Sequence, residues 1–302
     1  MPAFSLTDAA FEGFRLTRER PRVVAAWAVL YAVMSLASAV LMVMTIGPES
    51  ATLRATAQGV IPTDPAEAAR QSRIVAPFLL IMAPLVLVFW AVLTSAVYRA
   101  ILQPEQTGFG RIRFGADEIR MMGLIVILFL LLVSTLAALR MADSVGAALA
   151  VSGGVVGAVL GNLLRLAALA AIVAFWTRLS LAGPITFASR EIHLFRSWNL
   201  TKGHFWRLVA AYGLAICLAL VVMLLALVIF AAAALAFAAS SGVPLNHVER
   251  MFQPDMTSIA AYFTPAQIFN QVFSAVLLVA VFVVLLSPAA IIHQALTAAR
   301  NP

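Results

Sequence analysis

Arg165 and its neighbour Asn162 have the most costly placement in the sequence, and together they form the strongest candidate for a polar site. Both lie in an apolar stretch long enough to enter a membrane. A charged side chain at the centre of a membrane helix costs about 2.5–3.5 kcal/mol on insertion scales and usually faces a cavity or an opposite charge. In the alternative, Arg165 lies near the outer interface and extends its guanidinium group to the lipid headgroups.

Two acidic residues, Asp117 and Glu118, follow Gly115 at the predicted start of a helix. Acidic side chains in a first turn interact favourably with the helix dipole, so a structural role explains them. Acid–base catalysis would require burial or a partner, and the sequence identifies neither. The four histidines have no metal-ligand spacing, and no nucleophile elbow or phosphate-binding glycine loop is present. We predict no catalytic residue, no metal site and no cofactor.

A cluster of aromatic and basic side chains precedes the fifth long apolar stretch. Its members are Arg196, Trp198, Lys202, Trp206 and Arg207. Aromatic rings and long cationic side chains gather at the level of the lipid headgroups. The cluster predicts contact with membrane lipids, including anionic headgroups, either as a general anchor or as a specific recognition site.

Three glycines, Gly153, Gly157 and Gly161, recur at every fourth position in the fourth apolar stretch. Small residues at this spacing allow two helix backbones to approach closely. The pattern predicts helix packing, either within one chain or across the face of a homo-oligomer.

The composition indicates that lipid surrounds most of these residues. Hydrophobic residues make up 63% of the 302 residues and charged residues 11%, whereas soluble domains are about 45–50% apolar. The net charge of +7 lies in short segments between apolar stretches and forms no basic domain. We therefore exclude nucleic acid as a partner and expect an integral membrane protein.

Six stretches are long and apolar enough to cross a bilayer, which takes about 20 residues of helix. They are Val23–Ile46, Ile74–Tyr98, Met121–Leu139, Val145–Thr177, Leu208–Ala239 and Ile268–Ile292. The fourth is too long for one perpendicular crossing, so it is either a tilted helix or an interfacial segment followed by a shorter crossing. The fold class predicted is an all-α polytopic transmembrane bundle, with one membrane domain over residues 1–302.

The cations lie mostly on one side of the path that these six spans imply. With the N-terminus inside, the inner segments contain Arg15, Arg18, Arg20, Arg22, Arg99, Arg111, Arg113, Arg120, Arg178, Arg190, Arg196, Lys202, Arg207 and Arg300. The outer segments contain Arg54, Arg70, Arg73, Arg140 and Arg250. This bias predicts that both termini lie in the cytoplasm. The cations are nearly all Arg and Ala is abundant, which suggests a GC-rich bacterial genome, so we expect a multi-pass protein of the bacterial inner membrane.

The spans pair into three predicted hairpins, over residues 8–101, 114–182 and 190–298, each entered by a short amphipathic helix. Asp64-Pro65 and Thr264-Pro265 precede the second and sixth spans, each followed by Glu or Gln at the third helical position. This arrangement is typical of a capping box. The matching entries to the first and third hairpins suggest an internal repeat, which in membrane folds often places a site at the repeat interface.

The segment Ser197-Trp198-Asn199-Leu200-Thr201-Lys202-Gly203-His204-Phe205-Trp206-Arg207, which enters a long span, resembles a family of uncharacterised bacterial polytopic membrane proteins. That family includes the membrane domain found beside glycerophosphoryl diester phosphodiesterases. The hairpin layout is similar across most of the chain. The resemblance implies a fold and a membrane location, and it transfers no catalytic residue because the soluble phosphodiesterase domain is absent.

These patterns favour a non-enzymatic scaffold or accessory factor in envelope or lipid physiology. The alternative is a small-solute transporter or a lipid-translocating protein, which draws on the repeat, Arg165 and the prolines Pro77 and Pro84. The alternative is weakened because the acidic residues lie at or beyond the predicted span ends. A membrane enzyme, with Asp117, Glu118 and His293 as its candidates, comes third.

Overall fold

Long helices dominate the computed structural model of the chain, which describes residues 4–49, 64–106, 108–242, 244 and 247–299. Among these residues, five helices are long and apolar enough to cross a membrane. They are α2 (Pro21–Ile46), α4 (Pro65–Leu102), α5 (Ala116–Leu179), α8 (Phe205–Ser241) and α11 (Pro265–Ala298). The described part contains no strand, which confirms the all-helical class. Arg54 and Arg300 lie outside the described residues.

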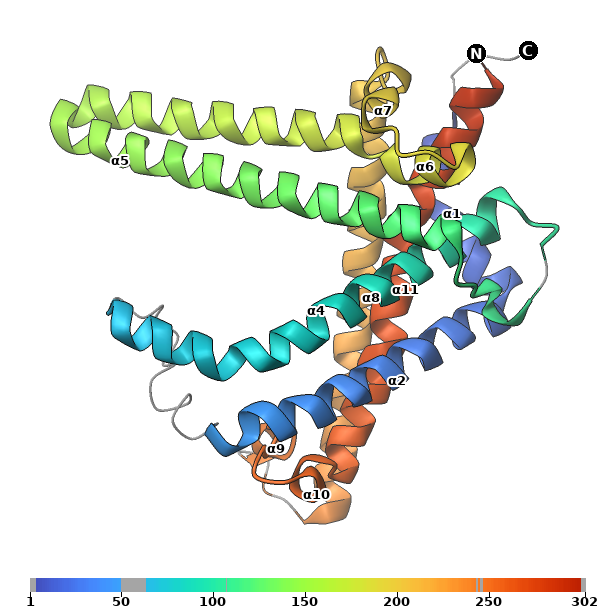
Figure 1. Cartoon of the computed structure of the whole chain (residues 1–302), viewed down its shortest axis with the longest axis vertical. Coiled ribbons are helices and arrows are strands. Elements are labelled where there is room, and N and C mark those ends of the chain that lie inside the picture. The colour runs from blue at the N-terminus through green and yellow to red at the C-terminus, as the bar shows by residue number, and fades with distance from the viewer. Residues whose placement is uncertain (1–3, 50–63, 107, 243, 245–246, 300–302) are drawn as a thin grey trace.

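Shorter elements connect the long helices. They are α1 (Leu6–Glu19), α6 (Ala182–Ser189), α7 (Leu194–Leu200), α9 (Val248–Met251), α10 (Ile259–Tyr262) and the 3₁₀ turns η1 (Gly47–Glu49) and η2 (Phe109–Arg111). Helix α1, the start of α8 and the end of α11 lie at one end of the molecule (Figure 1), which we call the terminal end. Helices α9 and α10 lie near the opposite ends of α2 and α8 (Figure 1).

The predicted N-caps of α4 and α11 are confirmed. The Asp64 carboxylate accepts a hydrogen bond from the Ala66 amide at 2.9 Å, and the Thr264 hydroxyl accepts one from the Gln267 amide at 3.3 Å. The reciprocal half of the capping box is wrong for Gln267, whose side-chain amide donates to the Phe252 carbonyl instead. Two prolines lie inside α4, and the helix bends along its length (Figure 1).

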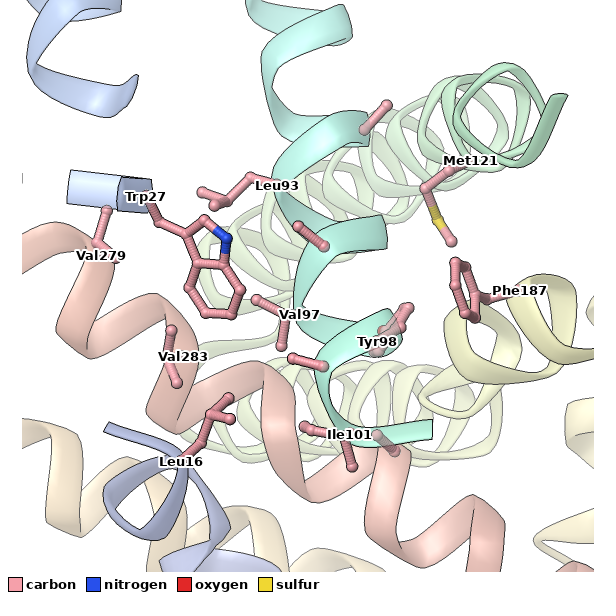
Figure 2. Close-up of a cluster of buried hydrophobic side chains, with 14 of the residues drawn as sticks. Leu16, Trp27, Leu93, Val97, Tyr98, Ile101, Met121, Phe187, Val279 and Val283 are labelled. Carbon is pink, nitrogen blue, oxygen red and sulfur yellow. The ribbon is translucent and has the colours of Figure 1, made fainter. Parts of the chain in front are cut away.

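The main core lies where α1, α2, α4 and α11 meet (Figure 2). Trp27 of α2 is fully buried there, between Leu93 of α4 and Val279 of α11 (Figure 2). Its indole Nε1 donates a 2.7 Å hydrogen bond to the Gly110 carbonyl oxygen, so the one polar atom of the ring is satisfied. Helix α2 is therefore fixed both to its neighbours and to the loop that follows α4.

Helix α1 is a docked helix rather than a free interfacial one. It packs against α11 and α8 and buries Ala9, Ala10 and Leu16. At Gly13 a Cβ atom would lie 2.6 Å from the Val284 Cα atom, so only glycine allows this approach. The predicted amphipathic entry to the first hairpin is therefore a helix, and its buried face packs against α11 and α8.

Helix α5 folds back on itself as a hairpin, and this corrects two of the predicted spans. The chain reverses at Gly154, whose φ of 54° and ψ of −135° are not helical. The first arm continues through residues 140–144, which the sequence analysis left as a loop between two spans, and the predicted span Val145–Thr177 straddles the turn. The physical reason is local: no Gly or Pro interrupts residues 139–145, whereas Gly153-Gly154 supplies the left-handed conformation that a reversal needs.

Candidate functional site

Arg165 lies in the second arm of the α5 hairpin, and its partner is Asp143 of the first arm. The Arg165 Nε atom lies 3.3 Å from Asp143 Oδ1, and Nη2 donates to the Asp143 carbonyl oxygen at 3.4 Å. Both side chains are 43% exposed. Asp143 falls between the predicted spans Met121–Leu139 and Val145–Thr177, so the sequence analysis expects it in a loop. That expectation is wrong, because Asp143 lies on helix α5, beside Arg165.

The hairpin extends away from the vertical helices α8 and α11 (Figure 1), so Arg165 does not project into the main core. Eleven residues separate it from the turn at Gly154, which corresponds to roughly 16 Å of helix. Asn162 lies one turn nearer the tip and is exposed. The candidate polar site is therefore an ion pair on a largely lipid-accessible hairpin.

The glycine pattern serves the contact between the two arms. A Cβ atom at Gly157 would lie 1.9 Å from the Leu149 carbonyl oxygen, and one at Gly161 would lie 2.4 Å from the Gly146 carbonyl oxygen. Gly153 is at the tip, where a Cβ atom would meet nothing within 4 Å. Two of the three predicted packing glycines thus face their own chain, where they allow the backbones to approach.

The aromatic and basic cluster is divided by the fold. Arg196 and Trp198 of α7, Lys202 in the following turn and Trp206 of α8 are exposed. Arg207 turns inward instead: its Nη2 donates to the Phe4 carbonyl oxygen at 2.7 Å, and its guanidinium lies 5.0 Å from the centre of the Phe4 ring. Four members can contact headgroups, whereas Arg207 holds the start of α1 against α8.

Two hydroxyl groups in the same segment explain its position. Ser197 Oγ donates to the Arg178 carbonyl oxygen at 2.6 Å and accepts from the Leu181 amide at 3.2 Å. Thr201 Oγ1 donates to the Ser197 carbonyl oxygen. These bonds tie α7 to the end of α5, so the motif behind the family resemblance has a structural role in this chain.

The sequence analysis missed a buried ion pair between Arg99 of α4 and Glu118 of α5. Arg99 Nη2 donates to Glu118 Oε1 at 2.5 Å, and the two side chains are only 4% and 2% exposed. Arg99 Nη1 also donates to the Arg111 carbonyl oxygen at 2.7 Å, and its guanidinium lies 5.5 Å from the centre of the Phe187 ring. Charge-assisted bonds of this kind offset the cost of burying both charges.

Arg111 caps the C-terminal end of α4. Its Nη1 donates to the carbonyl oxygens of Arg99 and Gln103, each at 3.1 Å, and its Nη2 donates to that of Pro104 at 2.9 Å. Burial, and then the charge of Arg20, lower the pKa of Arg111 from its ordinary value, yet an arginine remains protonated at neutral pH. The last carbonyls of α4 thus obtain the donors that a helix end lacks.

The two acidic residues at the start of α5 are both paired. Glu118 binds Arg99, and Asp117 Oδ1 accepts from Arg120 Nη1 at 2.8 Å. A signal for the buried pair was present in the sequence, since an arginine in the last turn of α4 faces an acid in the first turn of α5 across a short loop. Neither carboxylate is placed as an isolated base, so both fit structural roles best.

Searches for similar proteins give no match to any protein-family model, to any curated protein or to any solved structure. The family resemblance of residues 197–207 therefore stays a prediction.

Proposed function

We propose that this chain is an integral protein of the bacterial inner membrane that acts as a non-enzymatic scaffold or accessory factor in envelope or lipid physiology. Counting the two arms of α5 separately, the five long apolar helices supply six crossings. Three hairpins, formed by α2 with α4, by α5 and by α8 with α11, then keep both termini in the cytoplasm.

The observation that carries this proposal is the exposure of the apolar helices. In α2, α4, α5 and α8 the most apolar window is only 6–17% buried inside the protein, whereas in α11 it is 50% buried. Water would not tolerate apolar surface of this extent. A bilayer covers this apolar surface without cost. A chain segment that crosses a bilayer forms a helix, because the backbone groups of a helix hydrogen-bond to one another.

The pairing of the charged side chains supports a scaffold over an enzyme. The acids at the start of α5 bind Arg99 and Arg120, and the catalytic role considered for Asp117 and Glu118 would need one of them available to a substrate. The exposed cations and tryptophans of α7 suit contact with anionic lipid headgroups.

One observation favours the alternative, a small-solute transporter or lipid-translocating protein. The pair of Asp143 and Arg165 is half-exposed on a hairpin that is mostly apolar, and such charges often mark transport pathways. It is the weaker proposal, because the hairpin that carries the pair extends away from α8 and α11 (Figure 1).

Cysteine labelling in intact spheroplasts tests the topology. The native Cys217, which is exposed on α8, is first replaced by Ala. A membrane-impermeant maleimide should then modify a cysteine placed at Ser258, between α9 and α10, and spare one at Ala116, at the start of α5; both positions are exposed. After permeabilisation both should react. Labelling of Ala116→Cys but not Ser258→Cys in intact spheroplasts would overturn the proposed orientation.

A further inference from the structure

A polar pocket of about 370 Å³ opens where α4 ends and α5 begins. The loop between these helices and the residue that follows α6 complete its wall. Six charged side chains line it: Arg99, Arg113, Arg120, Arg190, Asp117 and Glu118. Four guanidinium groups against two carboxylates leave an excess of two positive charges.

The pocket is held in shape before any ligand arrives. Its floor is the buried pair of Arg99 and Glu118, and its loop is fixed by the bonds that Arg111 donates to the end of α4. Trp27 adds a bond from the core to Gly110 in the same loop. A site that is already organised loses little conformational freedom on binding.

Contacts within the protein do not explain why an arginine occupies position 190 in the pocket wall. It ends α6 in the left-handed conformation, with φ 58° and ψ 27°, a backbone shape that favours glycine. Arg111, with φ 54°, is the other described non-glycine residue with a positive φ, and its side chain is used for four carbonyl contacts. Arg190 is exposed, and its side chain forms no hydrogen bond or ion pair with any described residue.

The chemistry of the wall selects an oxyanion with more than one charge. Guanidinium groups are planar forks that match the oxygens of a phosphate and bind them in pairs. Both carboxylates already accept from arginines, which opposes a metal cation and leaves the Arg190 guanidinium for an anion. A phosphate monoester carries close to two negative charges at neutral pH, so a wall on which arginines outnumber carboxylates attracts it.

We propose that the pocket binds a phosphate monoester group, held by Arg190 and the other arginines of the wall. The group comes either from inorganic phosphate or from the headgroup of a lipid such as phosphatidic acid. The lipid source rests on the proposed function, because it requires the junction of α4 and α5 to lie at the membrane surface. Binding of inorganic phosphate does not depend on the topology.

Thermal unfolding of the detergent-solubilised protein tests this proposal. Inorganic phosphate should raise the melting temperature by about 2–4 °C for each tenfold excess over its Kd, measured against sodium chloride at equal ionic strength. A parallel series adds micelles with phosphatidic acid or with phosphatidylcholine. A response to phosphatidic acid alone assigns the lipid headgroup, and a response to both phosphate and phosphatidic acid assigns the phosphate group itself.

The decisive variant is Arg190→Gly. Glycine adopts the left-handed conformation without a steric cost, so the melting temperature without ligand should stay the same or rise. The affinity for the phosphate group should fall at least tenfold. Arg18→Ala, which removes an exposed cation of α1 that does not line the pocket, should leave the affinity unchanged. An equal loss in both variants, or no response of the unaltered protein to either source, would overturn the proposal, and the labelling at Ser258 would be unaffected.

Discussion

The main core around Trp27 and the α5 hairpin obtain their stability in opposite ways. In the core, α11 passes between α1, α2, α4 and α8, and half of its most apolar window is buried. In α5 the corresponding share is 6%, and side chains near the tip such as Val151 and Val155 are more than four-fifths exposed. The core relies on side-chain packing within the chain, whereas the hairpin relies on lipid around it and on close backbone contact between its arms.

The ion pairs of the two regions differ in the same sense. Arg99 and Glu118 are almost fully buried, while Arg165 and Asp143 are each 43% exposed. A buried charge that loses its partner is left uncompensated, because water cannot reach it. A half-exposed charge can turn towards water or a headgroup. The comparison therefore predicts mutational effects that differ in size as well as in location.

The largest effect is expected from Glu118→Ala. It leaves the Arg99 guanidinium buried with no carboxylate, which should destabilise the protein by about 3–5 kcal/mol. Thermal unfolding of the solubilised protein measures the loss. The matched control is Asp117→Ala on the same turn, whose partner Arg120 is about one-third exposed and which should cost at most about 1 kcal/mol. Similar losses in the two variants would show that burial does not distinguish the pairs.

An intermediate and local effect is expected from Gly157→Ala. The new methyl group would lie 1.9 Å from the Leu149 carbonyl oxygen, so the arms must separate, at a cost of about 1–3 kcal/mol. Amide hydrogen exchange should accelerate in residues 140–170 and remain unchanged around Trp27. Gly153→Ala serves as the control, because its methyl group meets nothing within 4 Å. Faster exchange in the core of Gly157→Ala would contradict the independence of the two regions.

The smallest effect is expected from Arg165→Leu. Polar contacts between membrane helices contribute about 0.6 kcal/mol on average, and removal of a charge from lipid partly offsets that loss. The melting temperature should change by no more than about 2 °C, and Arg165→Lys should behave alike because its stem also reaches the interface. Normal insertion with lost function in both variants would support the transporter alternative instead.

Local signals in the sequence predicted much of the helical framework. The ends of α2, α8 and α11 lie within a few residues of the predicted spans, because apolar runs of this length have few other structures available. The N-caps at Asp64 and Thr264 follow from residues only two or three positions away. The internal repeat, which needs no particular contact, stays a prediction.

The errors at the charged residues involve partners far apart in the chain. Asp143 and Arg165 are 22 residues apart, and Arg99 and Glu118 are 19 apart. Seen alone, the charges at residues 140–143 indicate a loop, because a lone charge in a helix that enters lipid is unfavourable. Arg165 on the second arm of α5 supplies the opposite charge that makes Asp143 acceptable in a helix, and only the folded structure shows this pairing. The turn therefore moves to Gly154, where the backbone permits it.

The contact between α1 and α11 has a consequence for the order in which the chain is made. The ribosome releases α1 well before α11, yet Gly13 of α1 closely approaches the backbone at Val284. Until α11 has been inserted, α1 must wait at the bilayer surface with its apolar face covered by lipid. Docking of α1 is therefore completed only after α11 has been made, and a chain stalled before α11 would display an undocked helix to the cell's quality-control machinery.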